Sequence, residues 1–218
     1  MAYKAILAGA SGLTGSALLS ILLQHPDYKE IVVLVRKPLP IENKKLFQVV
    51  VDFDQLDKYA DLISGHALFC CLGTTNKKTP NINAYRKIDH DYPLQLAHIG
   101  FKKEVSQFHF LSSLGANAKS STFYLRTKGE TEEDIKKIGL PSLDIYQPSF
   151  LTGDRKEKRN GEKFLTAAMK LIDPILKGSL KKYRSIPAAT VAMAMFKRSL
   201  INKEGIFIHP SDQIKQIA

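Results

Sequence analysis

A glycine-rich turn near the N-terminus constrains the fold more than any other feature of the sequence. Residues 4–8 read KAILA, a short apolar run typical of a buried strand, and residues 16–23 read SALLSILL, which indicates a helix that ends at Pro26. The glycines at positions 9, 12 and 15 have the spacing G-x-x-G-x-x-G. A strand, a glycine turn and a helix in this order form the unit that binds a dinucleotide.

The chemistry of a bound pyrophosphate explains the residue types in this turn. Glycine lets the backbone approach the pyrophosphate, and the free N–H groups and positive dipole end of the helix face the phosphates. Ser11 and Thr14 add hydroxyl donors at the same turn. A glycine triplet also fits a plain tight turn, but its place at the first βα junction favours binding through Gly9, Gly12 and Gly15.

Strand and helix signals alternate along the chain after this turn. Apolar runs predict further strands at residues 31–35, 47–51, 67–71, 107–111 and 143–146. Helical patterns lie between several of them, at residues 56–63, 84–101 and 122–138. Continuous apolar strands that alternate with helices specify a parallel sheet covered on both faces, and right-handed crossovers favour the doubly wound order. We therefore expect an α/β fold with a doubly wound parallel sheet, the NAD(P)-binding Rossmann fold.

The rhythm weakens in residues 149–218. Residues 152–163 are charged and contain glycine, which is typical of a mobile loop, and helical patterns follow at 164–176 and 187–200. A last short apolar run lies at residues 206–208. The length of 218 residues fits one α/β domain. We expect a single domain over residues 1–218, in which residues 149–218 form a small helical appendage on the substrate side.

Charge and hydropathy limit the class of protein. No apolar run reaches the roughly 18 residues of a membrane span, and Met1 leads directly into a strand without a targeting segment. We therefore expect a cytoplasmic protein with no membrane partner. The net charge of +11 comes without the interleaved aromatic residues or the module of a nucleic-acid binder. A basic surface that favours a small anionic substrate is the preferred interpretation.

Several other residues have ordinary structural interpretations. Cys70 and Cys71 are adjacent in an apolar run and are interpreted as small hydrophobic residues of a strand. The histidines lack metal-ligand spacing, so we predict no metal site; they include His66, His90, His98 and His109. An acidic run is interpreted as a solvated helix face paired with Lys136 and Lys137, and it comprises Glu130, Glu132, Glu133 and Asp134.

Two strand ends carry residues suited to the adenosine half of a dinucleotide. Arg36 and Lys37 follow residues 31–35, where an acidic residue binds the ribose 2′-hydroxyl of NAD and a cation accommodates the 2′-phosphate of NADP. This favours NADP(H) as the cofactor, with an ordinary surface pair as the alternative. Asp52 follows residues 47–51 and fits either an adenine contact or the cap of the next helix.

A serine pair, a tyrosine and a lysine carry the catalytic prediction. Tyr124 and Lys128 share one face of a helix, and a cation at that distance lowers the pKa of a phenol. Ser112 and Ser113 follow residues 107–111, where a hydroxyl can hold a substrate oxygen beside the phenol. The trio suits proton transfer coupled to hydride transfer at a carbonyl. A Tyr-x-x-x-Lys pair by itself also occurs on ordinary surface helices.

Four segments of the chain, taken in order, resemble a known family. They are residues 6–15 (ILAGASGLTG), 69–75 (FCCLGTT), 111–116 (LSSLGA) and 124–130 (YLRTKGE). They are similar to the short-chain dehydrogenase/reductase superfamily, and most to its atypical branch of Tat-interacting-protein-like oxidoreductases. The resemblance spans nearly the whole chain and implies NADPH binding. The positions that match its cofactor contacts are Ser11, Gly12, Leu13, Thr14, Arg36, Lys37, Leu72, Gly73, Tyr124, Lys128 and Arg155.

Some positions leave alternatives open or depart from the family pattern. Leu72 and Gly73 also fit an ordinary βα turn. Gln147 stands where the group usually carries arginine, so this cofactor position lacks a cationic contact. The asparagine of the superfamily's catalytic tetrad falls near Asp89, a departure that would weaken a proton relay. Alignment favours Ser113 over its neighbour as the acting serine.

These observations lead to one leading hypothesis and two alternatives. The leading hypothesis is an NADP-dependent oxidoreductase for a small carbonyl or alcohol, with Tyr124 as general acid/base, Lys128 lowering its pKa and holding the nicotinamide ribose, and Ser113 orienting the substrate. The first alternative is an NADPH-sensing regulatory protein with little turnover. The second is a nucleotide-sugar epimerase, which the short stretch after Pro148 disfavours. Short-chain reductases often assemble through helices, so a homo-oligomer is compatible with the resemblance.

Overall fold

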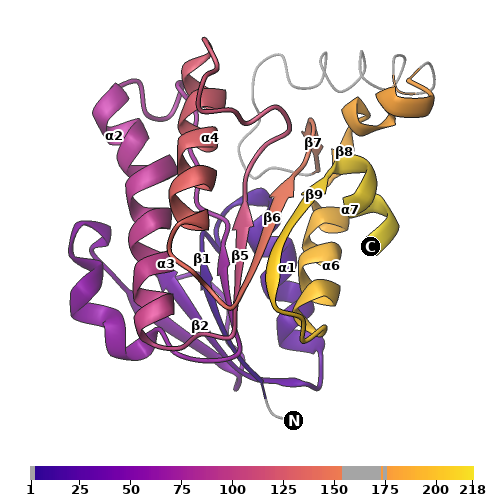
Figure 1. The fold of residues 1–218 in the computed structure, drawn as a ribbon. Helices are drawn as coiled ribbons and strands as arrows, with labels where there is room; N and C mark the ends of the chain where they lie inside the picture. Colours follow the sequence, from indigo (N-terminus) through magenta and orange to yellow (C-terminus); the bar gives the residue numbers. More distant parts are fainter. Residues whose placement is uncertain (1–2, 154–172, 174–175) are drawn as a thin grey trace.

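Seven parallel strands form the central sheet of the computed structural model, which describes residues 3–153, 173 and 176–218 (Figure 1). The strands are β1 (Tyr3–Ala8), β2 (Tyr28–Val35), β3 (Leu46–Val50), β4 (Ala67–Cys70), β5 (Gln107–Leu111), β6 (Ser142–Gln147) and β9 (Gly205–Pro210). Their order is β3-β2-β1-β4-β5-β6-β9, and every pairing is parallel. The chain moves outward from β1 to β3 and then returns to β4 on the other side of β1, which confirms the predicted doubly wound fold.

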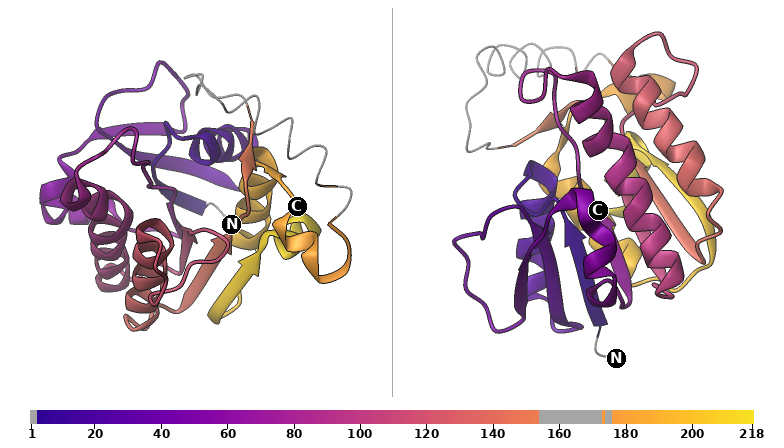
Figure 2. Two further views of the ribbon diagram at one scale, coloured as in Figure 1. Left: turned by 90° about the horizontal axis from the view of Figure 1, so that it is seen from above. Right: turned by 90° about the vertical axis from the view of Figure 1, so that its left-hand side faces the viewer.

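Helices cover both faces of the sheet (Figure 2, left). On one face α1 (Leu13–Gln24) packs beside α6 (Ala188–Ser199). The other face carries η1 (Phe53–Leu62), α3 (Tyr92–Lys102) and α4 (Phe123–Lys136). The sheet and its two helical layers therefore make the three-layer arrangement expected of this fold class.

Alternation along the strands explains the two cores. Ala5 and Leu7 of β1 are fully buried against the layer of α1 and α6. Ile6 and Ala8 are equally buried against the opposite layer. Successive strand side chains point to opposite faces, so a strand with helices on both sides must be apolar throughout.

The helical pattern at residues 84–101 divides into three parts in the structure. A short α2 (Ile82–Arg86) is followed by a π-helical turn η2 (Lys87–Asp91) and then by α3. Pro93 has no N–H group to offer the carbonyl of Asp89, and Thr131 Oγ1 of α4 lies 3.0 Å from that carbonyl oxygen and 2.7 Å from the carbonyl oxygen of Thr127, so its one proton is shared between the two. The break therefore coincides with a proline that cannot continue the regular helical hydrogen bonding.

The C-terminal segment contributes to the main sheet as well as adding helices. β9 pairs with β6 from Ser142 opposite Gly205 to Gln147 opposite Pro210, so the apolar run at residues 206–208 is an edge strand. A helix absent from the sequence prediction, α7 (Ser211–Ile217), follows it. Smaller elements complete the segment: β7 (Leu151–Thr152), β8 (Ile186–Pro187) and η3 (Gly178–Tyr183). Most of the helix predicted at 164–176 lies outside the described residues.

Candidate cofactor and active site

The glycine turn joins β1 to α1 at the carboxyl edge of the sheet (Figure 1). Gly9 has φ +88°, and a Cβ there would lie 2.5 Å from the carbonyl oxygen of Cys71. A Cβ on Gly15 would lie 2.2 Å from the carbonyl oxygen of Gly9. These two glycines are therefore required for the turn to pack against β4 and for α1 to start close to β1. Gly12 is exposed, so its missing side chain leaves the outer surface of the turn open.

The residues of this turn fit the pyrophosphate of a dinucleotide. No side chain caps the N-terminus of α1, and its first turn contains no acidic residue. Thr14 is 3% exposed, and its Oγ1 has no hydrogen-bond partner among the described residues. Ser11 is exposed and Leu13 half-buried beside it. An uncapped helix end with a buried, unpaired hydroxyl is what an anionic ligand would complete.

The residues expected near adenosine lie at the ends of β2 and β3. Arg36 and Lys37 are exposed directly after β2, and neither forms an ion pair within the described part of the chain. Asp52 caps η1, because its carboxylate accepts from the Asp54 N–H at 3.0 Å and from Gln55 Nε2 at 2.6 Å. Of the two interpretations of Asp52, the structure contains the helix cap.

Lys128 is buried in an ion pair beneath the turn that follows β4. Its Nζ lies 3.1 Å from Asp89 Oδ1 and 3.4 Å from the carbonyl oxygen of Leu111. A Cβ on Gly73 would lie 3.5 Å from that carboxylate oxygen and 3.8 Å from Nζ. Gly73 itself is exposed, so the ion pair lies directly under a backbone without a side chain. Leu72, half-buried before it, packs against the adjacent core.

The charge of Lys128 depends on this pair. Burial acts to lower the pKa of Lys128, but the carboxylate of Asp89 overrides it, so the pKa lies above its ordinary value. The N–H of Thr74 donates to Asp89 Oδ2 at 2.8 Å, which fixes the carboxylate to the turn after β4. Asp89, which stands near the position of the superfamily's tetrad asparagine, is thus a direct ion-pair partner of the predicted catalytic Lys128.

Tyr124 and the two serines complete the predicted catalytic set. Tyr124 lies one helical turn before Lys128 on α4 and is 37% exposed, whereas Lys128 is 3% exposed. Ser112 is buried and donates its hydroxyl to Glu132. Ser113 is half-buried, and its hydroxyl makes no hydrogen bond within the described residues. The geometry therefore leaves the hydroxyl of Ser113 available, in agreement with the preference for it.

The interpretation of the acidic run as a solvated face is wrong for Glu132. This residue is 4% exposed, and Gln147 Nε2 donates to both of its carboxylate oxygens, at 2.9 and 3.0 Å. Lys136 Nζ lies 3.7 Å away. The amide of Gln147, predicted to contact the cofactor, is therefore engaged by Glu132 in this structure. The sequence held one signal for the burial of Glu132, because residues 124, 128 and 132 are four apart and therefore lie on one face of the helix.

Other predicted features lie apart from this edge or outside the described residues. Arg155 belongs to the residues that the structure does not describe. Cys70 and Cys71 are buried core residues, and burial raises the pKa of Cys70 to about 11. Among the described residues, no three His, Cys, Asp or Glu side chains gather as metal ligands would. In the same part of the chain, every helix is too short or too polar to cross a membrane.

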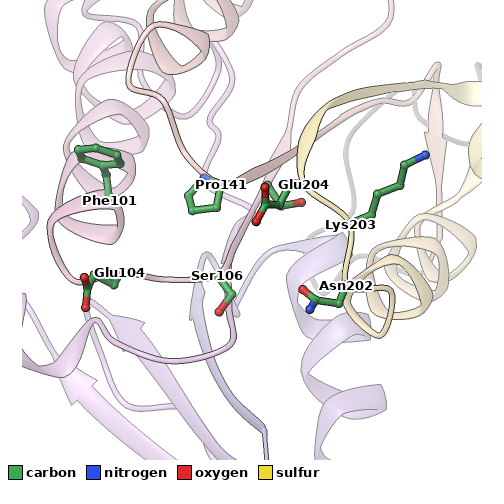
Figure 3. A pocket seen from close by; sticks show the side chains of 8 residues that line it. Phe101, Glu104, Ser106, Pro141, Asn202, Lys203 and Glu204 are labelled. Atoms are coloured by element: carbon green, nitrogen blue, oxygen red, sulfur yellow. The ribbon is translucent and has the colours of Figure 1, made fainter.

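One hollow of about 450 Å³ lies at the opposite, amino-terminal edge of the sheet (Figure 3). Its lining includes Phe101 at the end of α3, Pro141 before β6, and Lys203 and Glu204 before β9. None of the residues predicted to bind cofactor or substrate lines it. The candidate site is therefore built by the strand ends at the other edge.

Comparison with known proteins identifies the family. The model of the NAD dependent epimerase/dehydratase family matches residues 5–155. The chain belongs to this family. Members of the family depend on a nicotinamide dinucleotide, which agrees with the fit of the glycine turn to a pyrophosphate. The match also supports the resemblance to atypical short-chain dehydrogenases/reductases.

Relatives with curated names extend this family assignment. Protein HTATIP2 of Rattus norvegicus is 35% identical over 193 residues, which cover 87% of this chain and 78% of that protein. Protein FMP52, mitochondrial, of Kluyveromyces lactis is 34% identical over 167 residues, covering 75% of each chain. The protein of the same name from Saccharomyces cerevisiae is 29% identical over 158 residues, covering 71% of this chain and 68% of that one.

These names correct one expectation. The cytoplasmic location predicted from the N-terminal sequence is contradicted, because the fungal relatives in this family are named as mitochondrial proteins. A chain whose first residues lead directly into a strand does not identify its compartment.

Solved structures also share the fold. MoeE5 in complex with UDP-glucose and NAD superposes with a TM-score of 0.71 at 14% identity, covering 94% of this chain and 75% of that chain. The Bordetella bronchiseptica enzyme WbmH in complex with NAD+ gives 0.73 at 13% identity, covering 97% and 76%. At this identity the likeness establishes the Rossmann-like architecture alone.

Proposed function

We propose that this protein is an NADP-dependent oxidoreductase that transfers a hydride to or from a small carbonyl or alcohol. The observation that carries the proposal is the position of Lys128, buried beneath Gly73 and one helical turn from the exposed Tyr124. Lys128 Nζ lies near the carbonyl oxygen of Leu111 at the end of β5, and the uncapped N-terminus of α1 follows the end of β1, so both lie at the carboxyl edge of the sheet. A dinucleotide site and a proton-transfer pair at one edge suit a nicotinamide-dependent reaction.

The cofactor would be held by the strand ends described above. The backbone around Gly9, Gly12 and Gly15 and the hydroxyls of Ser11 and Thr14 would take the pyrophosphate. Arg36 and Lys37, exposed and without ion-pair partners among the described residues, would take the 2′-phosphate and so select NADP over NAD. We propose that the cofactor makes further contacts with Leu13, Asp52, Leu72, Gly73, Gln147 and Arg155. Bound NADPH would supply the hydride that reduces a carbonyl carbon.

The residues of α4 and the turn after β5 would handle the proton. Tyr124 would donate its phenolic proton to the carbonyl oxygen as hydride reaches the carbon, and it would take a proton in the reverse direction. Lys128 would hold the nicotinamide ribose and favour the phenolate by its charge. Ser113 would orient the substrate oxygen. The net charge of +11 favours an anionic substrate, which residues 149–218 would help to enclose.

Thermal unfolding with and without cofactor tests this proposal. NADPH at a hundred times its dissociation constant should stabilise the protein by about 2.7 kcal/mol, and NADH at the same concentration by much less. Turnover of a carbonyl panel with NADPH should then be lost in Tyr124→Phe while the NADPH stabilisation remains. Stabilisation by neither nucleotide would refute the proposal.

The buried partner of Lys128 favours a second candidate function. Asp89 balances the lysine charge at 3.1 Å, so Tyr124 receives less electrostatic help than an unpaired lysine would give. A protein that binds NADPH and changes a partner surface, with little turnover, is compatible with that balance. NADPH stabilisation without turnover on any carbonyl would favour this second function over the first.

A further inference from the structure

The ion pair of Asp89 and Lys128 joins two helices at the candidate site and is closed to solvent. Both side chains are nearly fully buried, at 1% and 4% exposure. Lys128 reaches it from α4 and Asp89 from the π-helical turn η2. We propose that Asp89 is a positioning residue whose carboxylate keeps Lys128 protonated and directed at the turn around Gly73. The inference rests on the proposed function only in the role that Lys128 plays toward cofactor and substrate.

The backbone around Asp89 is arranged to present this carboxylate. The π-helical turn is closed by the N–H of Tyr92, which donates to the carbonyl of Lys87, and the hydroxyl of Thr131 lies 3.0 Å from the carbonyl oxygen of Asp89. The N–H of Thr74 then holds Oδ2 at 2.8 Å. Oδ1 is left for Lys128, and it has no other polar partner in the described part of the chain. One oxygen thus anchors the carboxylate and the other serves the lysine.

The other titratable groups around Lys128 do not supply a negative charge. Cys70 and Cys71 of the β4 end are kept protonated by burial, which raises the pKa of Cys70 to about 11 and that of Cys71 further. Burial also raises the pKa of Tyr85 on α2. Tyr124 on α4 contributes a phenol and not a carboxylate. Among the described residues Asp89 is the one standing counter-charge of the lysine.

The remaining contacts of Lys128 are to groups without a formal negative charge. Nζ lies 5.1 Å from the centre of the Phe110 ring and 3.4 Å from the carbonyl oxygen of Leu111. A buried lysine without a carboxylate partner loses its proton several pH units below the ordinary value. Without Asp89, Lys128 would therefore lose its proton at a lower pH, and once neutral it would no longer act on Tyr124 or on a ribose hydroxyl through its positive charge.

Direct titration of Lys128 by NMR of ¹³C-labelled lysine tests the inference without cofactor or substrate. The Lys128 signal is assigned by its absence from Lys128→Arg. In the wild type it should stay in the charged form up to at least about pH 10.5, and Asp89→Asn should lower the midpoint by about 2 pH units or more. The control Glu130→Gln removes a different ion pair, the one between Arg86 of α2 and Glu130 of α4, and should leave the midpoint unchanged.

A midpoint in Asp89→Asn within half a unit of the wild type would overturn the inference. If that variant does not fold, the wild-type titration decides by itself, because a midpoint below the ordinary lysine value shows that Asp89 does not hold the proton. NADPH titration of the same samples at pH 7 and 9.5 is a separate readout. When the pH is raised from 7 to 9.5, the affinity of Asp89→Asn for NADPH should fall by a factor at least about ten times larger than the factor for Glu130→Gln. If no variant binds NADPH, that result would count against the proposed function. It would not affect the conclusion about Asp89 and Lys128, which comes from the NMR titration.

Discussion

The hydroxyl of Ser112 donates to the buried carboxylate of Glu132, which ties the end of β5 to the middle of α4. This contact separates the roles of two adjacent serines. Ser112 has its hydrogen bond inside the protein, whereas the hydroxyl of Ser113 is unpaired among the described residues. The first is held by a contact inside the protein, and the second has a hydroxyl that remains available for the substrate oxygen that we propose.

Alanine substitution should distinguish the two serines. Ser112→Ala removes a hydrogen bond to a buried charge and should lower the free energy of unfolding by about 1.5–3 kcal/mol. Ser113→Ala should change it by no more than about 0.5 kcal/mol, while it should reduce turnover on any accepted carbonyl. Urea denaturation and steady-state kinetics measure the two effects. Equal stability losses in both variants would contradict the assignment.

The glycines of the first turn should also differ in their tolerance of a methyl group. Gly15→Ala places a Cβ 2.2 Å from the carbonyl oxygen of Gly9, so we expect a loss of stability of about 3 kcal/mol or more. Gly12→Ala meets its nearest atom at 3.3 Å on an exposed surface, so it should fold and instead bind NADPH more weakly. Circular dichroism melts and NADPH titration check both; a stable Gly15→Ala would show that the turn can relax.

The charge at position 36 should set the choice of cofactor. Arg36→Glu replaces the cation proposed for the 2′-phosphate by the type of residue that binds a ribose 2′-hydroxyl, so NADPH affinity should fall at least about tenfold. NADH affinity should hold or improve. Lys44→Glu makes the same charge change at another exposed position and controls for net charge. Equal losses in the two variants would mean that the general basic field, and not residue 36, selects the nucleotide.

Acid should destabilise the protein through His109, which lies in the sheet away from the candidate site. Burial lowers the pKa of His109 to about 4, below the value of about 6.5 expected in the unfolded chain. Between about pH 6.5 and 4 the imidazole of His109 is protonated in the unfolded chain but not in the folded protein. The free energy of unfolding therefore decreases as the pH falls through this range.

The size of this acid effect can be measured by urea denaturation at several pH values. A single group with this shift contributes a loss of about 3 kcal/mol over that range. His109→Gln should flatten the pH dependence, whereas His98→Gln, at an exposed position, should leave it as in the wild type. An unchanged slope in His109→Gln would assign the acid sensitivity to other groups.

The parts of the fold that depend on local pattern could be predicted from the sequence. The strand, glycine turn and helix at residues 4–23 are specified by neighbours in the chain, and so is the shared helix face of Tyr124 and Lys128. The ion pair with Asp89 could not be predicted in the same way, because it joins two helices through a π-helical turn. In that turn the carbonyl oxygen of Asp89 lies against the Thr131 hydroxyl of α4, a contact between segments far apart in the sequence.

The partners that bury Glu132 could not be predicted from the sequence either. Glu132 belongs to a charged stretch, and charge runs usually face solvent. Its burial follows from Ser112 and Gln147, which come from the ends of two different strands and meet only after the sheet has formed. The strand at β9 was visible as an apolar run, but its place beside β6 depends on the crossover through α6.

The pairing of β9 with β6 also bears on how the chain reaches its native state. During synthesis β6 is complete before residues 205–210 have been added. Until then the backbone N–H and C=O groups on the β9 side of β6 have no strand to pair with. An unfilled parallel edge is a template for wrong partners, including another nascent copy. We therefore expect the edge of β6 to stay open to pairing with another chain until β9 has been synthesised.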